Sequence, residues 1–240
     1  MNFELTEDQQ AFVDTAKAFA DKELAPYAAQ WDEESHFPIE VFKKAGEMGF
    51  MGMYTPEDAG GFGMSRLDAA LIFEQLAGGC TATTAMMTIH NMVSWMIGSF
   101  GQPEAVEQWV PELVTGEKLG SYCLTEPGSG SDAASLRTSA KKDGDEYVIN
   151  GSKMFISGAG STDVLVVMAR TGEDGPKGIS AFVVPADAEG ISYGKKEAKM
   201  GWNAQPTRLV TFEDVRIPAK NLLGSEGEGF KFAMMGLDGG

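Results

Sequence analysis

The spacing of hydrophobic residues changes near Gly116, and this change divides the chain into two unlike parts. Before it, apolar residues recur three and four positions apart, as Val106, Trp109, Val110 and Leu113 do, which is the pattern of one helix face. After it, the apolar runs are short and are bounded by Gly, Pro and Asp, which is typical of β-strands. No helical pattern alternates with these strands, which argues against a parallel βαβ arrangement. The sequence therefore predicts an α+β fold, in which a helical domain precedes an antiparallel β-barrel or sandwich.

Helix-start signals mark four of the five helices expected in the first part of the chain. They lie at Thr6, Pro38, Ser65 and Pro103, and the fifth helix, over 81–99, is predicted without such a signal. The most apolar stretch of the chain covers residues 80–100, but Thr, His, Asn and Ser interrupt it. We therefore predict a buried helix over 81–99 rather than a membrane span.

The segment Glu146–Ile156 carries the strongest strand signal of the second part. Asn150 and Gly151 lie between two alternating runs, and Asn-Gly is a preferred pair for a tight hairpin turn. We predict a β-hairpin there. From Phe230 onward the pattern is helical again. Further strands are expected over 164–168, 179–184 and 208–212.

Composition narrows the function classes. The chain of 240 residues has 19 Lys and Arg against 35 Asp and Glu, a formal net charge of −16, which argues against a nucleic-acid binder because phosphate affinity comes from clustered basic residues. Two cysteines and two histidines are too few for a Cys- or His-rich metal site, so no metal is expected. Cys80 and Cys123 are predicted to be buried thiols of a reducing compartment. The acidic N-terminus has neither a secretory signal nor the character of a mitochondrial transit peptide.

Residues 122–135 combine the end of a strand with a loop of small residues, Tyr-Cys-Leu-Thr-Glu-Pro-Gly-Ser-Gly-Ser-Asp-Ala-Ala-Ser. Successive backbone N–H groups in such a loop form an anion-binding nest, and glycine allows backbone to approach a ligand closely. The hydroxyl groups of Thr125, Ser129 and Ser131 add donors. The loop is typical of a cradle for pyrophosphate or a polar heterocycle. The alternative is a plain Gly/Ser loop between strands.

The same run resembles the signature of the acyl-CoA dehydrogenase family. In that signature a strand ends in hydrophobic-Thr-Glu; two residues of any kind follow, then a small residue, and then Gly-Ser-Asp. Three other segments agree with that family in order and spacing, namely 149–157, 199–202 and 212–218. The resemblance covers the whole chain. It implies an N-terminal helical domain over 1–117, a middle β domain over 118–224, and the first turns of a C-terminal helical bundle over 225–240.

The resemblance also implies non-covalently bound FAD, which would be the organic electron acceptor that C–H oxidation requires. A first stretch, residues 122–131, is expected to line the isoalloxazine ring. A second stretch, residues 155–157, is expected to cover the other side of the ring, with the Ser157 hydroxyl at flavin N5. The residues implied at the cofactor are Tyr122, Cys123, Leu124, Thr125, Gly130 and Ser131 in the first stretch, and Phe155, Ile156 and Ser157 in the second.

Substrate contacts follow from the same resemblance. Ser131 is expected to touch the pantetheine arm of an acyl-CoA, and Asp238 to lie near the CoA portion. Trp95, on the helix 81–99, is expected to shorten the acyl pocket. Most relatives carry the catalytic Glu at a position beyond residue 240, and the minority position corresponds to Gly240, which has no proton acceptor. No residue of this chain is therefore assigned as the catalytic base.

The implied activity is α,β-dehydrogenation of a short, branched, isobutyryl-like acyl-CoA, with electrons passed to an electron-transferring flavoprotein. A homo-oligomer is expected, tetrameric in full-length relatives, with no nucleic-acid or membrane partner. The expected compartment is the bacterial cytoplasm, with the mitochondrial matrix as the alternative. A flavin oxidase or monooxygenase on the same fold remains an alternative enzyme, and a non-catalytic flavin- or acyl-CoA-binding module remains an alternative of another class.

Overall fold

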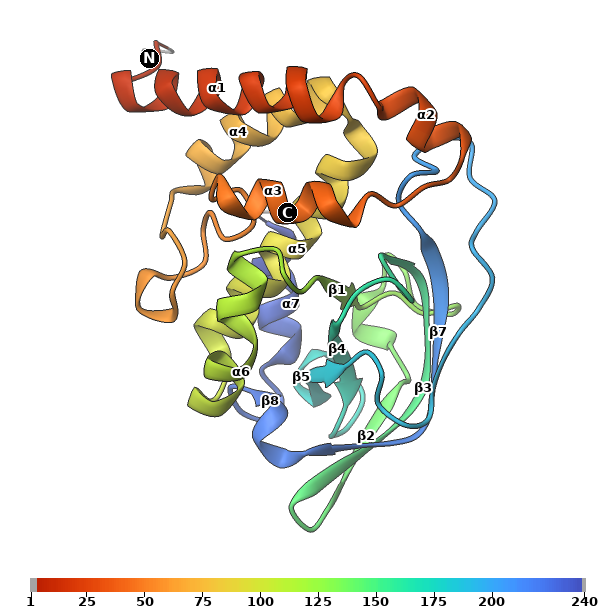
Figure 1. The fold of residues 1–240 in the computed structure, drawn as a ribbon. Coiled ribbons are helices and arrows are strands. Elements are labelled where there is room, and N and C mark those ends of the chain that lie inside the picture. Colours follow the sequence, from red (N-terminus) through yellow and green to blue (C-terminus); the bar gives the residue numbers. More distant parts are fainter. Residues whose placement is uncertain (1–3, 239–240) are drawn as a thin grey trace.

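The computed structural model describes residues 4–238, in which a group of helices lies beside a twisted sheet (Figure 1). The helices are α1 (Glu7–Phe19), α2 (Ala28–Glu33), α3 (Ile39–Glu47), α4 (Arg66–Gly79), α5 (Thr81–Phe100), α6 (Pro103–Val114) and α7 (Gly229–Leu237). The strands are β1 (Gly120–Cys123), β2 (Ser139–Asp143), β3 (Glu146–Ser157), β4 (Val164–Arg170), β5 (Ile179–Pro185), β6 (Ile191–Tyr193), β7 (Thr207–Pro218) and β8 (Leu222–Leu223).

The five predicted helix starts are confirmed within one residue. At α1, the Thr6 hydroxyl accepts from the Gln9 backbone N–H at 3.2 Å, and the Gln9 side chain accepts from the Thr6 N–H at 3.1 Å, which completes a capping box. Ser65 caps α4 by accepting from the Asp68 N–H at 3.1 Å. Pro38 stands directly before α3 and Pro103 is the first residue of α6. Side-chain caps therefore mark the starts of α1 and α4, and a proline marks the starts of α3 and α6.

The sheet has eight strands, in the order β6-β7-β3-β2-β4-β5-β8, with β1 paired to β4. The α+β class is confirmed, but the expectation of a wholly antiparallel sheet is wrong at two pairings. Gly120–Cys123 runs parallel to Val164–Val167, and Ser139 pairs in parallel with Arg170. Parallel neighbours need a long connection, and the β2–β3 arm between β1 and β4 provides it.

The predicted hairpin turn at Asn150 and Gly151 is also wrong. β3 passes through both residues without a break, and a shift in its register against β7 makes a β-bulge at Gly151, where φ is +147°. Asn150 and Asp214 face each other across this bulge and exchange two hydrogen bonds of 2.9 Å. The turn of the hairpin lies instead between β2 and β3, at Gly144 with φ +62°.

Helix α5 belongs to two hydrophobic cores. Met86 and Met87, near its start, are buried in a core with residues of α1, α3 and α4. Met92 and Met96, further along, are buried in a second core with residues of α6, α7, β4 and β5. A third core lies on the other face of the sheet. Figure 1 shows α5 passing from the helical group toward the sheet. Within residues 4–238, no helix is both long and apolar enough to cross a membrane.

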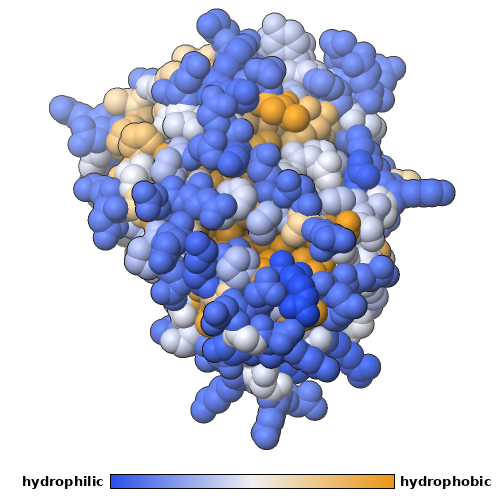
Figure 2. Space-filling model, turned by 60° about the horizontal axis from the view of Figure 1, so that its bottom comes forward, coloured by the Kyte–Doolittle hydropathy of each residue, from blue (hydrophilic) through white to orange (hydrophobic). Residues whose placement is uncertain are grey.

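Hydrophilic side chains cover most of the face shown in Figure 2, and hydrophobic side chains appear between them as separate patches. The exposed large hydrophobic residues include Leu67, Phe155, Met200 and Leu237. Phe155 and Leu237 border the cavity described below.

His90 connects α5 to α6 and to β1 through hydrogen bonds. Its ring is fully buried. Nδ1 accepts from the Gly120 N–H at 3.2 Å, so Nε2 carries the proton and donates to the Leu113 carbonyl at 2.9 Å. Burial lowers the pKa of His90 to about 4, which keeps the ring neutral at neutral pH. His90 is thus a buried packing residue, whereas His36 lies at the surface.

Acidification is expected to destabilise the protein through His90. The ordinary His pKa of about 6.5 applies in the unfolded chain, so between pH 6.5 and 4 the unfolded state binds one more proton than the folded state. The free energy of unfolding should therefore fall by about 2 kcal/mol from this residue between pH 7 and pH 4.5. Urea denaturation at both pH values measures the fall, which should shrink by that amount in His90→Gln and not in His36→Gln. An equal fall in both variants would rule out this assignment.

Candidate functional site

A cavity of about 600 Å³ lies where β1, β3, α5 and α7 meet. Its wall is built from four segments that are far apart in the sequence. They contribute Thr88, Ile89 and Met92 from α5; Tyr122, Leu124, Thr125 and Gly130–Ala134 from the end of β1 and the loop after it; Phe155–Ser157 from β3; and Phe230, Met234 and Leu237 from α7.

The residues predicted for cofactor binding gather at this cavity, with one exception. Successive side chains of a strand point to opposite faces, so Tyr122 and Leu124 line the cavity while Cys123 points away from it. Cys123 is fully buried in the third core, and burial raises the pKa of its thiol to about 12. Cys80 is buried as well, so both cysteines are confirmed as buried thiols.

The loop after β1 presents polar groups that have no partner within the protein. A turn in which Glu126 and Ser129 exchange backbone hydrogen bonds of 2.9 and 3.1 Å brings the chain back to the cavity. Among the described residues, the backbone N–H groups of Thr125, Gly130 and Ser131 find no acceptor. A Cβ built on Gly130 would meet no protein atom within 4 Å. These donors are therefore available to a molecule in the cavity.

The hydroxyl of Tyr122 is a further polar group of the cavity wall without a partner in the protein. The Tyr122 hydroxyl is buried and has no hydrogen-bond partner, and burial raises its pKa well above the ordinary value, so it stays protonated. Buried polar groups in proteins are nearly always paired, so an orphaned phenol in a cavity wall indicates a ligand or solvent partner.

A β-bulge shapes the wall that β3 contributes. The register of β3 against β7 shifts between Lys153 and Ile156, and Phe155 has a φ of +59°, in the left-handed region. As a result Ile156 remains buried, while Phe155 is 57% exposed at the edge of the cavity. The sequence pattern alone does not reveal this bulge.

A buried ion pair lies directly behind the loop. Lys153 is fully buried, and its Nζ lies 2.8 Å from Glu126 Oε1. Burial by itself would raise the pKa of Glu126, but the charge and hydrogen bond of Lys153 outweigh it and lower the pKa, so the carboxylate is ionised. Lys153 cannot be recognised as a buried residue from the sequence, because a lysine in an alternating strand normally faces solvent.

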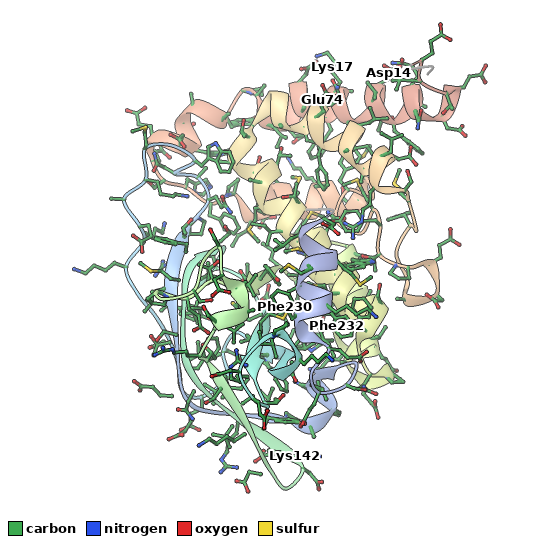
Figure 3. All side chains as sticks on the ribbon, turned by 180° about the vertical axis from the view of Figure 1, so that it is seen from behind. Asp14, Lys17, Glu74, Lys142, Phe230 and Phe232 are labelled. Carbon is green, nitrogen blue, oxygen red and sulfur yellow. The ribbon has the colours of Figure 1, made fainter. Side chains whose placement is uncertain are left out.

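Helices α5 and α7 supply a large part of the apolar wall, namely Ile89, Met92, Phe230, Met234 and Leu237. On α7, Phe230 lines the cavity, whereas Phe232 turns away and stacks on Phe100 with ring centroids 3.9 Å apart (Figure 3). Trp95 is not part of the cavity wall. It packs between Phe100, with ring centroids 5.3 Å apart, and the Arg66 guanidinium, 4.8 Å from its ring. Asp238 is exposed after the end of α7 and also lies outside the wall.

Asp132 is the single carboxylate among the described residues that line the cavity. Its backbone carbonyl accepts hydrogen bonds from the Ser129 and Ser135 hydroxyls at 2.7 and 2.8 Å. Its side chain is exposed. Glu126, the other acid of the motif, is held behind the wall by Lys153 and does not reach the cavity.

Comparisons with known proteins agree with this architecture. The family models "Acyl-CoA dehydrogenase, N-terminal domain" and "Acyl-CoA dehydrogenase, middle domain" match residues 6–117 and 121–215. Mitochondrial isobutyryl-CoA dehydrogenase of Bos taurus is 55% identical over 236 residues, which cover 98% of this chain and 57% of the relative. The chain thus spans little more than half the length of that relative.

Solved structures match over the whole chain as well. Butyryl-CoA dehydrogenase from Megasphaera elsdenii has a TM-score of 0.93 and 38% identity, and the match covers 100% of this chain and 64% of that one. A glutaryl-CoA dehydrogenase from Mycobacterium smegmatis in complex with FADH2 has a TM-score of 0.91 and 29% identity, covering 98% and 60%. The two family models together span the helical part and nearly all of the sheet, and the chain therefore belongs to the acyl-CoA dehydrogenase family, of which it contains the N-terminal and middle domains.

Proposed function

We propose that the cavity binds the flavin of FAD and the acyl end of a short acyl-CoA, and that the protein takes part in α,β-dehydrogenation of an isobutyryl-like thioester. One observation carries the proposal. Thr125, Gly130 and Ser131 line one cavity and their backbone N–H groups have no protein acceptor, and the buried hydroxyl of Tyr122, in the same wall, has no hydrogen-bond partner. The 55% identity to an isobutyryl-CoA dehydrogenase supports the choice of substrate.

The wall residues fit a flavin. A flat aromatic ring system needs apolar surface on its faces and hydrogen-bond donors along one edge, and this cavity offers both. Thr125, Ser131 and Ser157 would hold that edge, and Phe155 and Ile156 would cover a face. The chemistry that FAD supplies when bound is acceptance of a hydride from the β-carbon. Donors at the edge that gains negative charge favour that transfer.

The helix α5 is proposed to form the acyl pocket. Thr88, Ile89 and Met92 face the cavity on consecutive turns, and the two apolar residues exclude water from an aliphatic chain. Trp95 occupies the next turn along the helix, so we propose that it closes the direction in which a longer chain would extend. This arrangement favours a short acyl group, and Trp95 acts here from outside the cavity wall.

The remaining partners are proposals that rest on the family. Electrons would pass to an electron-transferring flavoprotein, and the full-length protein would be a homotetramer. The cytoplasm remains the predicted compartment. The bovine relative is mitochondrial, which supports the matrix as the alternative.

A titration with FAD tests the proposal. Gly130→Val places two methyl groups in the cavity and should weaken FAD binding about 10-fold to 100-fold, because overlap with a ligand costs about 1–3 kcal/mol. Gly128→Val is a matched control, since a Cβ there also meets no protein atom and Gly128 does not line the cavity. Quenching of free flavin fluorescence measures both affinities. Absence of binding by the unmodified protein, or equal weakening in the two variants, would contradict the proposed site.

A further inference from the structure

A buried ion pair between Lys153 and Glu126 joins two walls of the cavity from behind. Lys153 belongs to β3, whose next residues, Phe155–Ser157, form one wall. Glu126 belongs to the loop after β1, which forms the other wall. Neither charged side chain lines the cavity. Contacts between these two residues therefore link the walls without touching what the cavity holds.

Glu126 fixes the course of the loop through its carboxylate. Oε2 accepts from the Arg137 N–H at 2.7 Å, and Oε1 accepts from the Thr138 N–H at 2.9 Å and from Lys153 at 2.8 Å. The backbone of Glu126 is paired with Ser129 in the turn. The carboxylate thus holds the segment that leaves the loop against the segment that enters it, and two of the open donors, those of Gly130 and Ser131, lie between these two points.

Lys153 fixes β3 to the same loop. Besides Glu126, its ammonium group donates to the Leu124 carbonyl at 3.0 Å. The following residue, Met154, donates its N–H to the Thr125 carbonyl at 2.8 Å. With their carbonyls held on the β3 side, Leu124 and Thr125 present their side chains to the cavity. The bulge that exposes Phe155 begins directly after this anchored point.

Stability alone does not explain such a pair. Removing two charges from water costs several kcal/mol per ion, and well-packed apolar residues in place of a buried pair are often neutral or stabilising. A pair with four hydrogen bonds to defined backbone and side-chain atoms, by contrast, holds its surroundings in one geometry. Behind a ligand cavity, that property serves binding.

We propose that Lys153 and Glu126 are positioning residues for the flavin, which hold the loop after β1 and the end of β3 in register and keep the charge behind the cavity balanced. The inference rests on the proposed function, because it assigns a role toward the molecule that the cavity is proposed to bind. Neither residue is a catalytic residue, since neither reaches the cavity.

Charge balance distinguishes this role from a merely structural one. An uncompensated positive charge behind the cavity favours the more negative, reduced flavin, and an uncompensated negative charge disfavours it. Glu126→Gln keeps the shape of the side chain and leaves Lys153 without its counter-ion. Burial lowers the pKa of Lys153 and Glu126 opposes that effect, so the potentials are compared at the lowest pH at which the protein stays folded, where the ammonium group best keeps its proton. Lys153→Met leaves Glu126 unpaired. The flavin midpoint potential should therefore rise in the first variant and fall in the second, and the double variant should lie between them.

The experiment compares the unmodified protein with Lys153→Met, Glu126→Gln, the double variant and Lys142→Met. Lys142 is an exposed lysine of β2, so Lys142→Met controls for the loss of one surface charge (Figure 3). Amide hydrogen exchange is measured first, without FAD. Exchange over 124–132 and 155–157 should be faster in both single variants and unchanged in Lys142→Met. FAD affinity should fall about 10-fold or more in the single variants, as expected when a buried pair loses one member.

The double variant, which leaves no unpaired buried charge, keeps the test informative if a single variant fails to fold. Potential shifts of the same sign in both single variants, or unchanged exchange at the two walls, would overturn the proposal. If the unmodified protein binds no FAD, the proposed function fails, and the exchange measurement alone then decides whether the pair positions the two walls.

Discussion

A polypeptide of residues 1–240 that is loaded with FAD and mixed anaerobically with isobutyryl-CoA is expected to leave its flavin oxidised. Removal of the α-proton requires a carboxylate beside the thioester, and a well-placed base contributes about 10²–10⁴-fold to the rate. Among the described residues, the cavity wall offers only Asp132, whose side chain is exposed. Glu126 already accepts hydrogen bonds from Arg137, Thr138 and Lys153. Gly240, at the minority family position, lies outside the described residues and has no side-chain acceptor.

Bleaching of the visible flavin band measures this result. The same assay on a polypeptide extended to the length of the relatives serves as the positive control. Asp132→Asn and Glu126→Gln identify any residual base in the short chain. Substrate-dependent bleaching that disappears in either variant would show that the chain carries its own base, contrary to our expectation.

Gly229→Ala is expected to destabilise the protein by about 3 kcal/mol, the upper end of the usual cost of overpacking, because the neighbouring atoms belong to backbone. A Cβ at Gly229 would lie 2.3 Å from the carbonyl carbon of Ser180 and 2.7 Å from the Ala181 nitrogen, so the start of α7 has to move away from β5. Phe230 follows directly and lines the cavity, so flavin binding should weaken as well.

Gly78→Ala is the matched control for this change. Gly78 also lies in a helix, but a Cβ there meets no atom within 4 Å. Alanine is favoured over glycine in a helix by about 0.5–1 kcal/mol, so Gly78→Ala should stabilise the protein. Urea denaturation of the three proteins measures both effects. If both substitutions changed the free energy of unfolding in the same direction, close packing at Gly229 would not be the main determinant of the effect of Gly229→Ala.

The sequence reveals most of the elements because local chemistry determines them. Caps at Thr6 and Ser65 are contiguous signals, and the structure reproduces them. The Asn150-Gly151 pair is ambiguous, because the backbone freedom that suits a hairpin turn also suits a bulge in a continuous strand. Which one forms depends on Asp214, which is distant in the sequence. The parallel pairing of β1 with β4 likewise depends on strands that are not neighbours along the chain.

The residues of the candidate site also divide into those that a local motif reveals and those that depend on contacts distant in the sequence. The loop after β1 and the end of β3 are contiguous motifs, and both are found in the sequence. The contribution of α7 to the cavity wall is not evident from the sequence. The face that a helix turns toward a cavity depends on its packing, and no local pattern records that packing. Lys153 is missed for a related reason. Its burial is compensated by Glu126, which lies on another segment and carries no local mark of the pairing. Trp95 is located on the correct helix, but one turn beyond the wall.

Because α5 is buried partly in the helical core and partly in the core of the sheet, the two domains are not interchangeable modules. A chimera of two relatives joined near residue 118 would place α5 of one parent against α7 and the sheet of the other. Contacts there are close, since a Cβ on Gly236 would lie 3.0 Å from the Met92 sulfur. A seam placed before Thr81 keeps α5 with its sheet-side neighbours and leaves the mismatch to the contacts of α5 with α1–α4. Recombination among these proteins is therefore expected to succeed more often at the α4–α5 junction than at the boundary between the two family domains.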